Sequence, residues 1–226
     1  MRVNRDRWDA ALLVLAILFV LAAVVMIFLY APREATMGDV QRIFYFHVAS
    51  AWVGFLGFFI TSLSGALYLV GGERRWDILS LSSVEVGLTF ITMAVATGAL
   101  WARPVWGVYW TWDPRLTISA IQLLIYIAYL MLRSSIDGPE QQARFAAVYG
   151  IIAFATVPLS WFAIRWWRTI HPDLLTGGGG MGFDARMVST LIVSVGALSL
   201  LYVVLVRVRA RLERCRDAVA ALRERV

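Results

Sequence analysis

AALLVLAILFVLAAVVMIFLY (residues 10–30) carries no charged side chain, and it decides the class of this 226-residue chain. About 20 apolar residues cross the hydrocarbon core of a bilayer as one helix, so this stretch predicts a membrane span. The chain is 60% hydrophobic and 16% charged, whereas an ordinary soluble domain is about half apolar and about a quarter charged. We therefore expect an integral membrane protein.

Five further apolar runs are long enough to cross a bilayer. Together they predict an all-α, polytopic membrane protein with six transmembrane helices in a single membrane domain, residues 1–226. The spans are expected at roughly 10–30, 46–70, 79–100, 116–132, 145–164 and 187–206. The first run lacks a small-residue cleavage site, which favours a retained anchor over a removed signal peptide. The single Cys215 excludes an internal disulfide, a zinc cluster and a covalent haem-attachment motif.

The arginines predict the orientation of these helices. All 21 basic residues are arginines, and they cluster at the ends of the apolar runs. Fourteen lie before the first run or after the second, fourth and sixth, and seven lie in the alternate loops. Because cytoplasmic segments carry the excess of arginine, both termini are expected to be cytoplasmic, with a basic tail at 207–226. Loops 31–45, 101–115 and 165–186 are then expected on the outer face.

The net charge of +6 therefore indicates contact with the lipid bilayer rather than with nucleic acid. No basic soluble face with interleaved aromatic residues is predicted, so no nucleic-acid partner is expected. The basic tail predicts a helix at the inner surface that binds anionic lipid. Docking to a cytoplasmic partner is the alternative for the same tail.

The chain has two histidines: His47 is expected where the first outer loop meets the second span, and His171 in the fifth loop, on the same face. Two imidazoles without a Cys, Asp or Glu ligand nearby in sequence make a poor zinc or iron(II) site. They do supply the two axial positions of a haem, whose ring provides the other four nitrogens. The pair therefore predicts an outward-facing haem site, although a single histidine near a membrane surface usually needs no such role.

The third loop contains four tryptophans within twelve residues. These tryptophans are Trp101, Trp106, Trp110 and Trp112. A belt at the lipid headgroups explains them as well as a flat, apolar ligand does. A haem requires a wide apolar platform and cations for its propionates, and arginine pairs well with carboxylates. The candidate cations are Arg42, Arg103, Arg115, Arg165 and Arg168. Together with the histidines, these features favour haem over a belt.

Several local features have structural interpretations. Asp113-Pro114 predicts the start of the fourth helix, because Asp is a favoured N-cap and Pro a favoured first helical residue. Pro158 is expected to loosen the fifth helix. Glu85 lies inside the third span, where a snorkelling or protonated carboxyl and a functional role are equally compatible with the sequence. The glycine run 177–180 permits a mobile loop around His171.

Residues 106–113, WGVYWTWD, resemble the WGxxWxWD (WWD) signature of haem-handling membrane proteins in cytochrome c maturation. The continuation PRLT at 114–117 resembles the D-x-R-L-T form of the haem exporter protein C (CcmC) branch. The six spans and the run RIFYFHV at 42–48 resemble the same family. The resemblance covers nearly the whole chain, and the two ends match in character only.

The resemblance implies haem b, bound non-covalently and transiently, with His47 and His171 as axial ligands of its iron. The residues expected to hold the ring and its propionates are Trp101, Trp106, Trp110, Trp112, Asp113, Arg42, Arg103 and Arg115. It further implies a multi-pass protein of the bacterial inner (plasma) membrane that exports haem and delivers it to a periplasmic haem chaperone for c-type cytochrome biogenesis. The implied partners also include an ABC-type ATPase with its membrane subunit and a small single-span accessory protein.

Two other classes of function stay open. One is a b-type electron-transfer membrane cytochrome, which would usually hold its haem between helices at depth. The other is a haem-free membrane scaffold or permease with a tryptophan belt. No Walker lysine motif and no hydrolytic arrangement occurs in the sequence, so the chain is not expected to be an enzyme.

Overall fold

The computed structural model describes residues 2–172 and 184–223, and this part of the chain is helical apart from its connections. Six helical segments in it are long and apolar enough to cross a membrane, which confirms the predicted fold class. They are α1 (Arg2–Val25) continued by η1 (Met26–Tyr30), α2 (Arg42–Gly71) preceded by η2 (Asp39–Gln41), α3 (Arg74–Trp106), α4 (Pro114–Ser134), α5 (Pro139–Phe154) with α6 (Thr156–Trp166), and α7 (Ala185–Arg223). The glycine run 177–180 lies outside the described residues.

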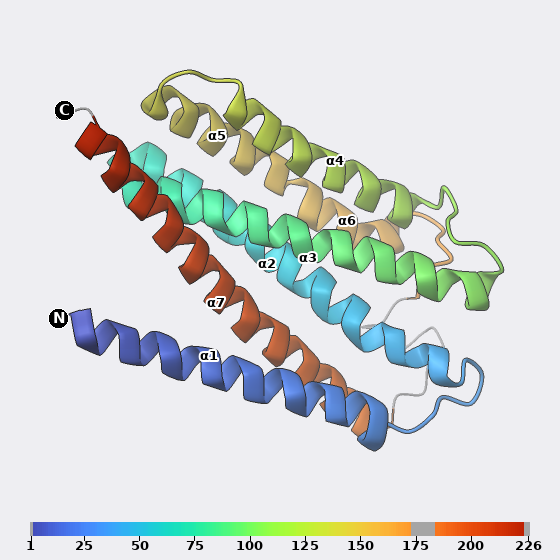
Figure 1. Cartoon of the computed structure of the whole chain (residues 1–226). Coiled ribbons are helices and arrows are strands. Elements are labelled where there is room, and N and C mark those ends of the chain that lie inside the picture. Colours follow the sequence, from blue (N-terminus) through green and yellow to red (C-terminus); the bar gives the residue numbers. More distant parts are fainter. Residues whose placement is uncertain (1, 173–183, 224–226) are drawn as a thin grey trace.

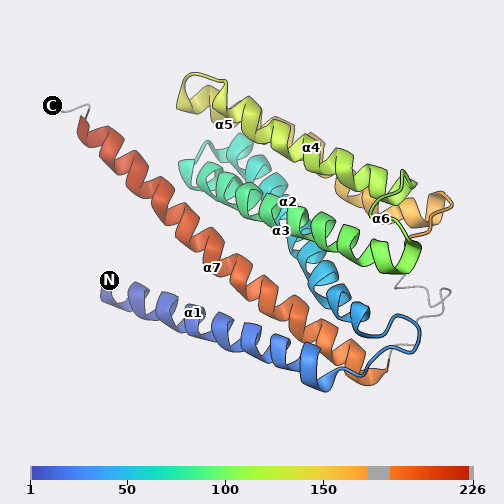
Figure 2. The same cartoon turned by 45° about the vertical axis from the view of Figure 1, so that its right-hand side comes forward.

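The helices α2 and α3 form an antiparallel pair at the centre of the bundle (Figures 1 and 2). Helices α4, α5 and α6 pack on one side of this pair, and α7 packs on the other and carries α1. Gly57 and Gly87 bring the central pair together, because a Cβ at Gly57 would lie 2.8 Å from the Cα of Gly87. Small residues at a helix crossing let backbones approach closely inside a membrane.

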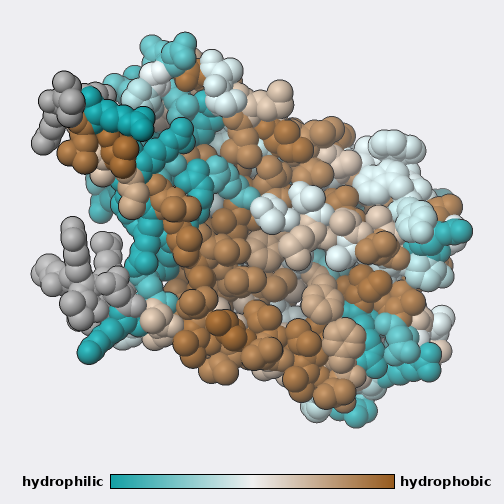
Figure 3. Space-filling view, in the orientation of Figure 1, coloured by the Kyte–Doolittle hydropathy of each residue, from teal (hydrophilic) through white to brown (hydrophobic). Residues whose placement is uncertain are grey.

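Both ends of the described chain lie at one end of the bundle, and the loop between α3 and α4 lies at the other (Figure 1). Apolar side chains cover the middle of the face seen in Figure 3, and hydrophilic ones gather toward its two ends. This distribution suits a protein whose middle lies in hydrocarbon and whose ends lie in water.

Two of the predicted outer loops are shorter than the sequence indicated. α2 begins at Arg42, so 42–45 is helical, and α3 continues to Trp106, so 101–106 is helical. The first turn of α2 is held by buried aromatic side chains, since Tyr45 packs in a cluster with Ile27 and Met187. α3 ends where Gly107 adopts a left-handed conformation with φ of 79°, which glycine alone adopts readily.

The fifth span is broken at Ala155 into α5 and α6. Pro158 has no N–H to donate to the carbonyl of Phe154 four residues earlier, and its ring clashes with that carbonyl. The break follows directly, and the expectation that Pro158 loosens this helix is confirmed. Thr156 compensates locally, since its hydroxyl donates to the carbonyl of Ala153 at 2.6 Å.

The end of the bundle that holds the chain termini is closed by ion pairs. Arg133 of α4 makes two hydrogen bonds, of 2.6 and 2.7 Å, to the buried carboxylate of Asp77 at the start of α3. Arg74 also pairs with Asp77 and extends the network to Glu213 and Asp217 of α7. These contacts join three helices that are remote in sequence.

Glu85 has a partner that the sequence did not reveal, because Arg209 of α7 donates to its carboxylate at 3.0 Å. Arg207 and Arg211 of the basic tail both pair with Asp9 of α1. Three of the tail arginines therefore hold helices together within the chain.

Candidate functional site

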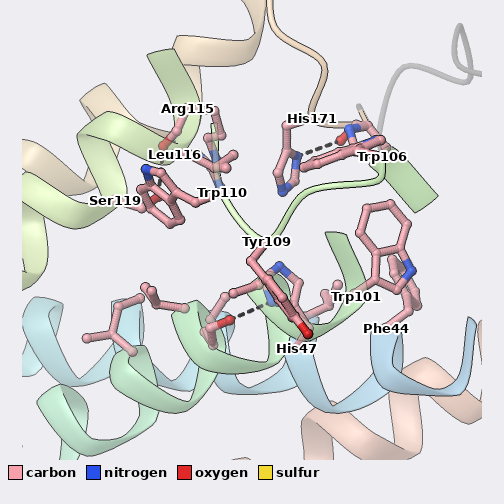
Figure 4. Close-up of a pocket in the computed structure, with 18 of the residues that line it drawn as sticks. Phe44, His47, Trp101, Trp106, Tyr109, Trp110, Arg115, Leu116, Ser119 and His171 are labelled. Atoms are coloured by element: carbon pink, nitrogen blue, oxygen red, sulfur yellow. Dashed lines mark hydrogen bonds between the residues drawn. The ribbon is translucent and has the colours of Figure 1, made fainter. Parts of the chain in front are cut away.

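An open pocket lies at the end of the bundle opposite the termini, between α2, α3 and α4 (Figure 4). It contains about 900 Å³ of space between protein atoms, counting its open mouth. Its lining is mostly apolar and aromatic and includes both histidines: Phe44, His47, Val48, Ala51, Phe55, Ile91, Ala94, Val95, Gly98, Ala99, Trp101, Trp106, Tyr109, Trp110, Arg115, Leu116, Ser119, His171 and Pro172. Apolar pockets with a few convergent polar groups are typical of small-molecule and cofactor sites.

The two imidazole rings face each other across this pocket. His47 lies in the second turn of α2, and His171 lies in the segment that follows α6. Their ring centroids are 6.3 Å apart and their planes are inclined by 42°. Two nitrogen–metal bonds of about 2 Å would separate the centroids of rings that ligate one metal from opposite sides by about 6 Å. The spacing therefore suits two axial ligands of a single metal.

Hydrogen bonds fix which nitrogen of each ring faces the pocket. Nδ1 of His47 bonds to the carbonyl of Ala94 at 2.8 Å, and Nδ1 of His171 bonds to the carbonyl of Pro172 at 3.1 Å. A carbonyl only accepts, so each Nδ1 is the donor, and in the neutral ring Nε2 then carries the lone pair. Figure 4 shows the unbonded nitrogens turned toward each other.

His171 is uncharged at neutral pH. Burial, with the nearby charge of Arg115 as a second cause, lowers the pKa of His171 to about 4. Only neutral imidazole has a lone pair for a metal, so this environment favours ligation over protonation.

Gly98 of α3 makes room for the His47 ring, and the sequence analysis did not identify it. A Cβ at Gly98 would lie 2.9 Å from Cε1 and 3.1 Å from Nδ1 of that ring. The ring is thereby held against α3 between Gly98 and the carbonyl of Ala94. A small residue four positions after Ala94 is the only signal that the sequence offered.

We expect Gly98→Ala to displace the His47 ring and, with the haem that the sequence predicts as the ligand, to weaken retention of that ligand by about tenfold, the lower end of the range for residues that orient a metal ligand. The helix itself should not suffer, since alanine favours helix over glycine by about 0.5–1 kcal/mol. Haem content per purified protein measures the effect. Gly196→Ala in α7 is the matched control, because a Cβ there meets only Phe19 at 4.0 Å. Equal haem content in both variants would contradict the placement of His47.

Three of the four predicted tryptophans line the pocket. Trp101 and Trp106 come from the last turns of α3 and pack edge to face with centroids 5.3 Å apart, and Trp110 comes from the loop. The indole N–H groups of Trp101 and Trp110 are buried and have no hydrogen-bond partner among the described residues. Trp112 does not line the pocket and is 79% exposed.

One of the five predicted arginines lines the pocket. Arg115 donates to the hydroxyl of Ser160 at 3.1 Å and has no ion pair among the described residues. Arg42 instead donates to the carbonyls of Ile27 and Phe28, which lack helical partners at the end of η1.

The other three predicted arginines also lie outside the pocket lining. Arg103 donates to the carbonyl of Gly107 and lies over the ring of Tyr109. Arg165 and Arg168 are exposed and do not line the pocket.

Asp113 caps α4, as predicted, by accepting from the N–H of Arg115 at 3.1 Å. It does not line the pocket. Its carboxylate also accepts from the hydroxyl of Thr169 at 2.5 Å and from the N–H of Ile170 at 3.0 Å. The sequence analysis did not identify Thr169, whose only signal is its place two residues before His171.

Comparison with known proteins identifies the family. The family model described as Heme exporter protein C (CcmC) matches residues 2–225. Heme exporter protein C of Bradyrhizobium diazoefficiens is 33% identical over 193 residues, which cover 85% of this chain and 73% of that relative. The protein of the same name from Haemophilus influenzae is 28% identical, over 83% of this chain and 77% of its own length. That of Escherichia coli K12 is 27% identical, over 63% and 58%. The chain therefore belongs to the haem exporter protein C family, and it is a multi-pass bacterial inner-membrane protein that handles haem in cytochrome c biogenesis and is not an enzyme.

Proposed function

We propose that this chain binds haem b non-covalently in the pocket, with Nε2 of His47 and Nε2 of His171 as the two axial ligands of its iron. The observation that carries the proposal is the pair of imidazole rings, 6.3 Å apart, whose Nδ1 atoms bond to backbone carbonyls and whose Nε2 atoms face each other. The ring of the haem then lies between them against the aromatic wall. The family of the chain supports haem as the cargo.

Three donors at the pocket suit the propionates of a haem. Arg115 donates to Ser160 and has no carboxylate partner among the described residues, and the indole N–H groups of Trp101 and Trp110 are buried and unpaired there. Buried donors without partners are costly, and a bound carboxylate would satisfy them. We assign Arg115 and these two indoles to the propionates.

The cargo is presented for transfer rather than stored. We infer a periplasmic location for the pocket, since the arginine-rich segments lie at the other end of the bundle. Exposed aromatic side chains at the pocket end, including Trp112 and Tyr109, form a surface for a periplasmic haem chaperone. An ABC-type ATPase with its membrane subunit and a small single-span protein complete the proposed assembly.

The test is to purify the full chain from haem-replete cells and to mix it with the chaperone. We expect a Soret band that moves to the chaperone fraction. Haem that cycles reversibly with quinone and never transfers would instead identify an electron-transfer cytochrome. Protein without a Soret band would identify a haem-free scaffold or permease.

The assignment of Arg115 is tested by binding haem and haem dimethyl ester to the same protein. A charged hydrogen bond contributes about 1.5–3 kcal/mol, so the wild type should bind the free acid more than about tenfold more tightly. Arg115→Met should reduce that preference and leave ester binding unchanged. An equal preference in both proteins would remove Arg115 from the propionate site.

A further inference from the structure

We propose that Asp113 is a latch that holds His171 in place, and that the aromatic loop 107–112 controls this latch. The inference rests on the proposed function, because it assigns His171 as the releasable ligand and His47 as the fixed one. It makes Asp113 a positioning residue, which acts on the haem through another residue. Asp113 does not line the pocket, so direct contact with the cargo is not what its position indicates.

Asp113 supplies the hydrogen bonds that tie the described part of the His171 segment to another element. After the last turn of α6, residues 168–172 are not helical. In the described part of the chain, their only hydrogen bonds to another element are the two that Asp113 accepts, from Thr169 at 2.5 Å and from Ile170 at 3.0 Å. The N–H of His171 in turn donates to the Thr169 hydroxyl at 3.1 Å. Two hydrogen bonds, relayed by the Thr169 hydroxyl, thus connect the Asp113 carboxylate to the backbone N–H of His171.

His47 is held in a different way. It lies within α2, and its Nδ1 bonds to the backbone of α3 at Ala94. Gly98 of α3 lies directly against the same ring. Movement of this imidazole requires the central helix pair to separate, whereas the segment of His171 is tied to another element, within residues 2–172 and 184–223, by two hydrogen bonds to one carboxylate.

The position of Asp113 links the latch to the aromatic loop. It directly follows residues 107–112, whose side chains include the exposed Tyr109 and Trp112. A protein that docks on these side chains and shifts the loop would move the carboxylate away from Thr169 and Ile170. Docking would then loosen one of the two proposed axial ligands while His47 stays in place, which would open a position for a ligand of the accepting protein.

Amide hydrogen exchange in the haem-free full chain tests the latch without relying on haem binding. Thr169→Val removes one of the two bonds and leaves the cap of α4 intact. Asp113→Asn keeps a good N-cap residue and removes the charge. We expect exchange in 168–171 to rise about tenfold or more in both variants, the effect of losing a charged hydrogen bond. Thr169→Ser, which keeps the hydroxyl, is the matched control and should exchange like the wild type.

The haem-loaded protein supplies the second readout. Added imidazole should replace the His171 ligand more readily in Thr169→Val and Asp113→Asn, with the spectrum of a haem still bound to His47. Unchanged exchange in both variants overturns the latch. A rise in Asp113→Asn alone, accompanied by faster exchange in the first turn of α4, also overturns it, since the residue would then act only as a cap. Failure of haem to bind at all would refute the proposed function and leave the exchange result readable.

Discussion

His47→Ala is expected to reduce haem content more than His171→Ala, although each variant loses one of two axial ligands. Even residues that only orient a metal ligand change metal affinity by about 10–100-fold, so the loss of a ligand should exceed tenfold. The asymmetry follows from how each ring is held. His47 sits in a helix and against the backbone of α3, whereas His171 lies in a non-helical segment tied to Asp113.

Haem per protein and the position of the Soret band measure this effect. In His171→Ala the haem should remain partly bound through His47, with a spectrum that added imidazole returns toward that of the wild type. Trp8→Ala is the control, because Trp8 is exposed on α1 and does not line the pocket. Wild-type spectra in both histidine variants would refute the axial assignment and, with it, the site.

The class of fold and six of the residues that line the pocket were predictable from sequence, for physical reasons. Uncharged runs of about 20 residues have few alternatives to a membrane helix, so the six spans followed directly. The chain has only two histidines, and both were expected at the same end of the bundle as the tryptophan loop. The structure brings His47, His171, Trp110 and Arg115 to one pocket.

What the sequence left out are contacts between distant segments. Thr169 matters because it bonds to Asp113, and Gly98 because it lies against the ring of His47. Both partners are remote in the chain. The sequence also predicted five arginines as partners of the propionates, because all five lie near the outer loops. Of these, Arg115 lines the pocket. A charge such as that of Arg42 is taken up by helix-end carbonyls that only the packing of α1 against α2 brings within reach.

The ion pair of Asp77 and Arg133 should carry the largest stability effect in the protein. Asp77 is 2% exposed and Arg133 is 5% exposed, and removing one partner of a buried pair costs about 3–5 kcal/mol, because the other charge is left uncompensated. The two single variants should differ. Asp77→Asn leaves Arg133 without a carboxylate partner among the described residues, whereas Arg133→Met leaves Asp77 paired with Arg74.

We therefore expect Asp77→Asn to lower the free energy of unfolding in detergent by about 3–5 kcal/mol and Arg133→Met to lower it by less. The double variant Asp77→Asn/Arg133→Met should lose less than the sum of the two, since no unpaired charge remains in it. Haem content measured on the folded fraction is the control, because the pair lies at the opposite end of the bundle from the pocket. Additive losses would contradict a direct coupling, and a larger loss in Arg133→Met would show that Arg74 does not compensate for it. Additive losses would assign the stability of this end of the bundle to the wider network that Arg74 makes with Glu213 and Asp217.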